Sequence, residues 1–106
     1  GGSIGANLAL LYGAKASPRV VVALSPGLNY KGVKTEIASR NFRQNLLLVA
    51  SKDDNYSFES SERLFEISAA SKKEFIKYED AGHGTRMFNS ESELKQRILD
   101  FLAKNL

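Results

Sequence analysis

The sequence has no cysteine and a single histidine among its 106 residues. The absence of cysteine excludes disulfide bonds, thiolate metal sites and a cysteine nucleophile. One histidine without any cysteine also argues against a tightly bound zinc ion, so we expect no metal site. Nothing in the sequence suggests an organic cofactor either.

Long apolar segments and blocks of like charge are also missing. No apolar run approaches the roughly 18 residues of a membrane-spanning helix, and no signal segment begins the chain. The 15 basic and 12 acidic residues are mixed in sign and give a net charge of +3, so no nucleic-acid surface is indicated. We interpret the charged residues 72–74 as a solvated rim rather than a phosphate-binding patch. We therefore expect a soluble, cytoplasmic protein with no nucleic-acid or membrane partner, although a targeting segment upstream of Gly1 is left open.

Apolar residues follow helical and strand patterns in alternation. Helical spacing is found in residues 4–14, 58–70 and 90–102 and more weakly in 30–45, whereas strand-like runs occupy 19–24, 45–51 and 74–80. The first two strand runs are continuously apolar, which predicts a sheet covered on both faces. The order αβαβαβα predicts one α/β domain spanning residues 1–106, with a mostly parallel sheet and flanking helices.

Two local patterns refine the predicted helices. Gly5, Ala9 and Gly13 are four residues apart, so we expect one smooth helix face that approaches the sheet closely. Ser90 and Glu93 have the spacing of a capping box, which predicts the start of the last helix there.

The chain begins with Gly1-Gly2-Ser3-Ile4-Gly5, a G-x-S-x-G sequence that leads directly into the first predicted helix. In a nucleophile elbow, a serine takes a strained backbone conformation, and the flanking glycines avoid Cβ clashes. The competing interpretation is a glycine-rich helix start or a remnant of an expression tag. The rest of the chain argues against this interpretation, because two further catalytic residue types follow in a fitting order.

Asp53 and Asp54 directly follow the apolar run 45–51, at the expected carboxyl end of a parallel strand. Catalytic groups collect at such ends in open α/β sheets. The competing interpretation is that one of the two aspartates only begins a turn or caps the next helix. Asp80 is interpreted as a turn residue.

His83 stands between Gly82 and Gly84, just after the last predicted strand. Glycine on both sides removes side-chain bulk and lets an imidazole swing into a site, which is unfavourable for a packing role. We therefore interpret His83 as catalytic rather than as a solvated loop residue.

Serine, acid and histidine in this chain order resemble the α/β-hydrolase superfamily. The segments LSPGLNYKG and YEDAGHGTRMF resemble its bacterial esterase and dienelactone-hydrolase-like members. The resemblance implies a serine hydrolase for a small-molecule acyl substrate such as a carboxylic ester. In it Ser3 attacks the acyl carbon, His83 transfers the proton, and the Ile4 backbone N–H is one oxyanion donor. The family pattern G-x-x-D fits Asp53 in one register and Asp54 in another. We favour Asp54, because a strand that ends at Val49 or Ala50 leaves Ser51 for the glycine position, and Asp53 stays the alternative.

A complete α/β-hydrolase is about twice as long, so the resemblance implies the C-terminal half of such a fold, starting at the nucleophile elbow. The second oxyanion donor normally comes from an earlier loop, so we expect the isolated chain to be slow at best. An unpaired sheet edge would favour dimerisation or pairing with an N-terminal half. The alternative function is a non-catalytic remnant or interaction module. A lyase or haloperoxidase on the same fold also stays open, because a fold does not determine its chemistry.

Overall fold

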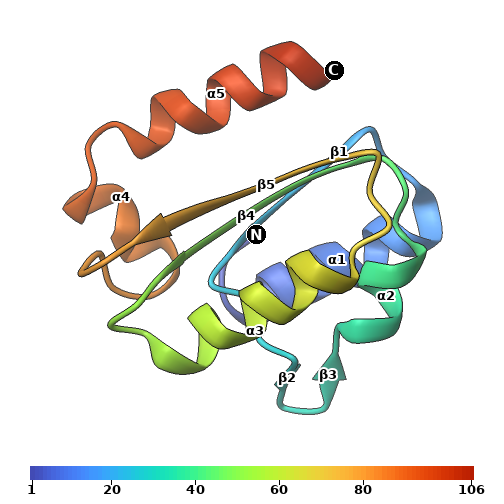
Figure 1. Ribbon diagram of the computed structural model, residues 1–106, viewed down its shortest axis with the longest axis horizontal. Coiled ribbons are helices and arrows are strands. Elements are labelled where there is room, and N and C mark those ends of the chain that lie inside the picture. Colours follow the sequence, from blue (N-terminus) through green and yellow to red (C-terminus); the bar gives the residue numbers. More distant parts are fainter.

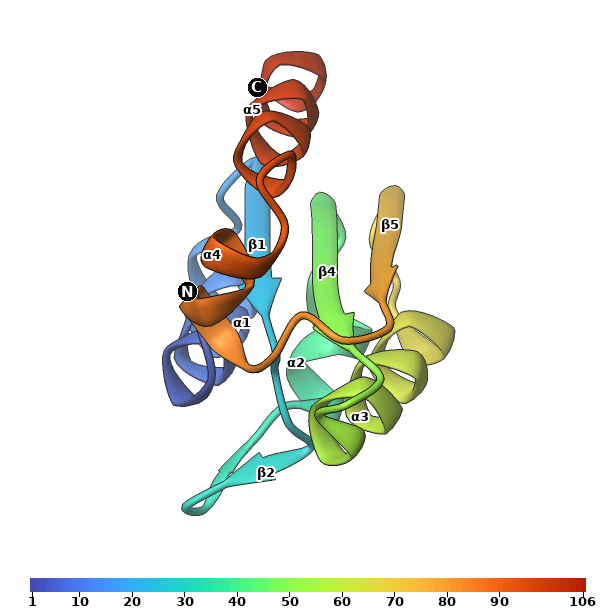
Figure 2. The same ribbon diagram turned by 90° about the vertical axis from the view of Figure 1, so that its left-hand side faces the viewer.

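Three apolar runs of the sequence form the strands of one parallel sheet. The computed structural model describes all residues from Gly1 to Leu106. The sheet has the order β1-β4-β5 and consists of β1 (Val20–Leu24), β4 (Asn45–Ser51) and β5 (Lys72–Tyr78). Val20 pairs with Asn45, and Asn45 pairs with Lys72, so the strands start at one level. Their carboxyl ends therefore lie along the same edge of the sheet (Figure 2).

Helices cover both faces of this sheet (Figure 1). One face carries α1 (Ile4–Ala16), α2 (Glu36–Asn41) and α3 (Asn55–Ile67), and the other carries η1 (Gly84–Arg86), α4 (Met87–Ser90) and α5 (Leu94–Asn105). None of the helices combines the length and apolar character that crossing a membrane requires. The predicted class, an α/β domain with a parallel sheet between helices, is confirmed.

Strand β4 joins the two hydrophobic cores. Leu46 and Leu48 belong to the core beneath α1, α2 and α3, whereas Leu47 and Val49 belong to the core beneath α4 and α5. All four side chains are fully buried. Successive side chains of a strand point to opposite faces, so burial of every position requires cover on both. The continuous apolar run predicted this arrangement correctly.

The segment between β1 and β4 differs from its weak helical pattern. Helix α2 spans only Glu36–Asn41, and an antiparallel hairpin of β2 (Asn29–Tyr30) and β3 (Val33–Lys34) precedes it. Lys31 and Gly32 form the two-residue loop, and both have positive φ, at 52° and 87°. Positive φ at both central positions is typical of the tight hairpin turn whose twist matches the strands. The prediction of a helix over the whole segment was wrong, because the tight turn at Lys31 and Gly32 outweighs a weak helical pattern, and only Glu36–Asn41 is helical.

The predicted capping box is not formed. Ser90 is the last residue of α4, and α5 begins at Leu94 with Glu93 as its N-cap. No side chain caps the amino end of α5. Glu93 instead accepts a hydrogen bond from the Tyr78 hydroxyl at 3.1 Å. This contact connects the start of α5 to the end of β5, so a tertiary partner has replaced the local one.

The small-residue face of α1 approaches the sheet at only one of its glycines. A Cβ at Gly13 would lie 2.6 Å from Val21 Cγ2, whereas a Cβ at Gly5 would meet no atom within 4 Å. Close helix–sheet packing therefore requires glycine at position 13. The expected close approach was wrong at Gly5, because no atom of the sheet lies near enough to contact a Cβ there.

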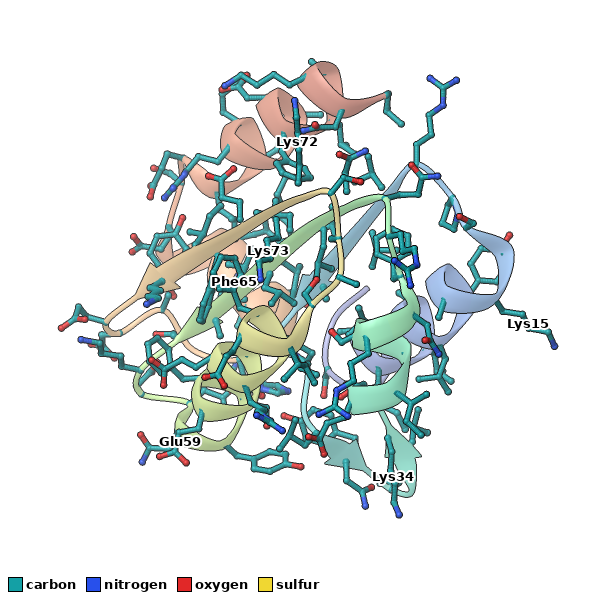
Figure 3. The ribbon with its side chains drawn as sticks, turned by 45° about the vertical axis from the view of Figure 1, so that its right-hand side comes forward. Lys15, Lys34, Glu59, Phe65, Lys72 and Lys73 are labelled. Atoms are coloured by element: carbon teal, nitrogen blue, oxygen red, sulfur yellow. The ribbon has the colours of Figure 1, made fainter.

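The charged start of β5 packs against the neighbouring helix. The Lys73 ammonium donates hydrogen bonds to the Phe65 and Ser68 carbonyl oxygens and lies 4.8 Å from the centroid of the Phe65 ring. Figure 3 shows Lys73 and Phe65 side by side. The last carbonyls of α3 lack intrahelical partners, so this lysine satisfies them.

Candidate active site

Each of the three predicted site residues follows a segment of the same parallel sheet. Gly2 forms a parallel bridge with Leu24, so the chain before Ser3 continues the sheet beyond β1. Asp54 follows β4, and His83 follows β5. All three segments leave the sheet at its carboxyl edge, where side chains from separate strands come together.

Ser3 occupies a sharp turn between the strand segment and α1. Its N–H donates to the Leu24 carbonyl at 2.8 Å, and the next residue, Ile4, begins the helix. Ser3 has φ of 55° and ψ of −125°, a conformation that side-chain-bearing residues rarely adopt. Strain of this kind costs about 1 to 3 kcal/mol and persists only where the surrounding structure imposes it.

Gly1 permits the tight turn around Ser3. A Cβ at Gly1 would lie 2.5 Å from the carbonyl oxygen of Gly5, a separation that real Cβ atoms do not show. The two outer glycines of the G-x-S-x-G sequence thus approach each other across the serine. The steric demand falls on Gly1 alone, since the space around Gly5 is open.

Asp54 and His83 are in direct contact. The Asp54 carboxylate is hydrogen-bonded to His83 Nδ1. Asp54 stands at the N-cap position of α3, but its side chain makes no capping hydrogen bond. The carboxylate therefore orients the imidazole instead of stabilising the helix start. The Asp54 side chain is 19% exposed and the His83 side chain 40% exposed, so the pair is shielded mainly on the aspartate side.

Asp53 points to the backbone of the same loop. Its Oδ1 accepts a hydrogen bond from the Gly82 N–H at 3.2 Å. Hydrogen bonding by the nearby Ser51 hydroxyl, and to a smaller extent by the Gly82 N–H, holds the pKa of Asp53 below its ordinary value. Asp80 makes no hydrogen bond to His83. Of the three nearby aspartates, only Asp54 contacts the imidazole.

Four consecutive residues of the histidine loop are held by side chains from the ends of β1 and β4. Each of these residues hydrogen-bonds to a different side chain: Ala81 to Ser51, Gly82 to Asp53, His83 to Asp54, and Gly84 to Ser25. The Ser51 and Ser25 side chains are fully buried. The sheet edge therefore fixes the position of the loop, as preorganised sites require.

The segments that carry Ser3 and His83 lie next to each other. A Cβ at Gly2 would be 3.6 Å from Thr85 Cγ2 and 3.8 Å from Gly84 Cα. No hydrogen bond joins the Ser3 hydroxyl to His83, and His83 Nε2 makes none. The structure thus brings Asp54 and His83 together and places Ser3 in the adjoining segment.

The Ile4 N–H, the expected oxyanion donor, makes no hydrogen bond within the chain. The first N–H groups of a helix have no intrahelical partner and carry partial positive charge. An unpaired donor directly after Ser3 can therefore bind an anionic oxygen.

Sequence reasoning missed Ser25 and Tyr30. Ser25 is a buried serine with φ of 53° at the end of β1, and the following Pro-Gly pair was the only signal for an unusual turn. Tyr30 lies in the hairpin, and its ring is perpendicular to that of His83, with 6.1 Å between ring centroids. Burial raises the pKa of Tyr30.

No group of three or more histidine, cysteine, aspartate and glutamate side chains is arranged to hold a metal ion. Comparison of the chain with protein-family models, curated protein sequences and solved structures finds no match in any of the three.

Proposed function

We propose that this chain carries the catalytic centre of a serine hydrolase that cleaves carboxylic esters or related acyl compounds. The observation that carries the proposal is a strained Ser3 at a strand–helix turn beside a loop whose His83 is hydrogen-bonded to Asp54. An ordinary helix start does not require a serine with positive φ. A nucleophilic serine that must project from the end of a sheet requires this conformation.

In this mechanism, Ser3 Oγ attacks the acyl carbon while His83 Nε2 accepts the hydroxyl proton. The proton then passes to the leaving oxygen as the bond to the acyl carbon breaks, and water hydrolyses the acyl-Ser3 ester in a second round. Asp54 holds Nδ1 protonated and stabilises the imidazolium cation. The Ile4 N–H donates to the oxyanion, in keeping with its free position at the start of α1.

A fluorophosphonate probe tests the nucleophile, because it reacts with activated serines and adds a defined mass. We expect intact-mass spectrometry to show one adduct, lost in Ser3→Ala. Ser17→Ala is the matched control, since Ser17 ends the same helix with a φ of 53° and lies on the surface. An adduct that survives Ser3→Ala would disprove the nucleophile assignment.

A pair of aspartate variants tests the acid. Hydrolysis of p-nitrophenyl acetate should fall far more in Asp54→Asn than in Asp53→Asn, because only Asp54 contacts the imidazole. A triad aspartate replaced by asparagine lowers kcat by about 10⁴-fold in serine proteases, since the amide favours the wrong histidine tautomer. Equal losses in the two variants would contradict the assignment of Asp54.

A second candidate function is a protein-interaction module, favoured by the outer face of α1. Ile4, Leu8, Leu11 and Tyr12 lie on this face and are 38 to 65% exposed. Contiguous exposed apolar side chains often mark contact surfaces. Concentration-dependent sedimentation that Leu8→Lys abolishes, with no Ser3 adduct in any buffer, would favour this function over the hydrolase.

A further inference from the structure

We infer that Tyr30 is a positioning residue for His83, whose ring restricts the imidazole in addition to the Asp54 hydrogen bond. Its catalytic consequence rests on the hydrolase proposed above, whereas its effect on the imidazole does not. The β2–β3 hairpin that carries Tyr30 thereby becomes a wall of the site.

His83 needs a second support. The imidazole is held by one hydrogen bond at Nδ1, and it stands between two glycines with positive φ, at 88° and 61°. A single hydrogen bond allows the ring to swing about its own axis, and flanking glycines do not restrict it. Proton transfer requires Nε2 to stay aimed at the serine, so a contact that fixes the ring plane contributes directly to catalysis.

The Tyr30 ring supplies this contact. It meets His83 nearly perpendicularly, at an interplanar angle of 83°, which is the favourable edge-to-face geometry of aromatic pairs. Tyr30 also meets the Tyr56 ring at 75°, with 5.4 Å between centroids. Both tyrosine rings lie against Gly27, where a Cβ would be 2.7 Å from each. Tyr30 is therefore itself confined between a second aromatic ring and the backbone.

Hydrogen bonds fix the tyrosines further. The Tyr30 hydroxyl is hydrogen-bonded to Ser57, and the Ser57 hydroxyl is 3.1 Å from the Ser25 carbonyl oxygen. Ser25 in turn accepts the Gly84 N–H at 2.8 Å. The same short network therefore holds both Tyr30 and the loop of His83, so the two rings keep a constant relative position.

Nuclear magnetic resonance (NMR) can test the inference without any turnover, because His83 is the only histidine and its ring signals are unambiguous. In the unmodified chain, we expect nuclear Overhauser contacts between the Tyr30 and His83 ring protons. Tyr30→Ala should shift the His83 Hδ2 and Hε1 resonances. Tyr30→Phe keeps the ring and loses only the hydroxyl hydrogen bond to Ser57, so its pattern should stay closer to the wild-type pattern than that of Tyr30→Ala. Tyr12→Ala is the control, since Tyr12 is 65% exposed on α1.

Absence of the ring contacts in the unmodified chain overturns the inference even if Tyr30→Ala fails to fold. So does a folded Tyr30→Ala with unchanged His83 signals, or a Tyr30→Phe that behaves like Tyr30→Ala. Ser3→Ala should leave the signals in place. A chain that hydrolyses no ester but shows the ring contacts would therefore count against the proposed function and not against this role.

Kinetics separate positioning from substrate binding. In p-nitrophenyl acetate hydrolysis, Tyr30→Ala should lower kcat about tenfold with little change in KM, because a misdirected base slows the chemical step. Tyr30→Phe should restore most of the rate. A raised KM with unchanged kcat would overturn the positioning role.

Discussion

Ser25→Ala tests how firmly the sheet edge holds the histidine loop. The Ser25 side chain is fully buried and its Oγ accepts the Gly84 N–H at 2.8 Å. Alanine removes the acceptor and leaves a buried N–H unpaired, which costs about 1 to 3 kcal/mol. Serine and alanine have similar backbone strain at a φ of 53°, so this strain largely cancels in the stability difference between the wild type and Ser25→Ala.

The same substitution at Ser61 is the matched control. Ser61 is equally buried, but its hydroxyl has no hydrogen-bond partner. Removing an unsatisfied buried hydroxyl relieves a desolvation penalty, and alanine is the better helix former by up to about 0.5 kcal/mol. Ser61→Ala should therefore be neutral or stabilising.

Urea unfolding followed by circular dichroism measures both variants. A small domain loses about 1 to 3 kcal/mol of stability per molar urea. The midpoint should thus fall by about 1 M in Ser25→Ala and stay or rise in Ser61→Ala. Free energies of unfolding for the two variants within about 0.5 kcal/mol of each other would refute the reasoning, because that is the ordinary scatter of unremarkable substitutions.

The remaining predictions concern α1 and Asp53. Gly13→Ala should destabilise the chain by about 1 to 3 kcal/mol, because its Cβ would overlap Val21, whereas Gly5→Ala should stabilise it by up to about 1 kcal/mol in the same urea assay. The lowered pKa of Asp53 means that its contribution is present above the ordinary carboxyl pKa and is lost as pH falls through the folded-state value. The stability difference between wild type and Asp53→Asn should therefore be largest near neutral pH and shrink below about pH 4, and a difference independent of pH would contradict the assigned cause.

Buried strands were the most predictable part of this fold. The run 45–51 became β4 with the predicted bounds, because a short and almost continuously apolar run is typical of a strand covered on both faces. The last strand was shifted by two residues, to Lys72–Tyr78. Its charged start is an edge position, where hydrophobicity gives no signal.

Local signals failed where a tertiary partner was available. The Ser90–Glu93 spacing suits a capping box, but Glu93 accepts a hydrogen bond from the hydroxyl of Tyr78, which lies fifteen residues earlier in β5. The hairpin before α2 depends on positive φ at Lys31 and Gly32, and a lysine gives little indication of such a conformation. Sequence patterns describe interactions between residues close together in the chain, and they give no indication of tertiary contacts such as the Tyr78–Glu93 hydrogen bond.

For the candidate site, the sequence located the segments but not their supports. Ser3, Asp54 and His83 were selected from glycine context and strand ends, and the structure joins Asp54 to His83 by a hydrogen bond. Their roles in catalysis stay predictions. Ser25 and Tyr30 were missed because a buried serine and a hairpin tyrosine are ordinary residue types, and their contacts arise only from the tertiary fold.

The four hydrogen bonds of the histidine loop bear on folding as well as on chemistry. Their partners lie 29 to 59 residues apart along the chain. Contacts this distant form only after the entropy of closing long loops has been overcome, so they belong to the late stages of folding. The amide protons of Ala81 and Gly84 should therefore exchange with solvent only through openings that separate the loop from β1 and β4. Hydrogen exchange at these two amides would therefore measure how often the histidine loop separates from the ends of β1 and β4.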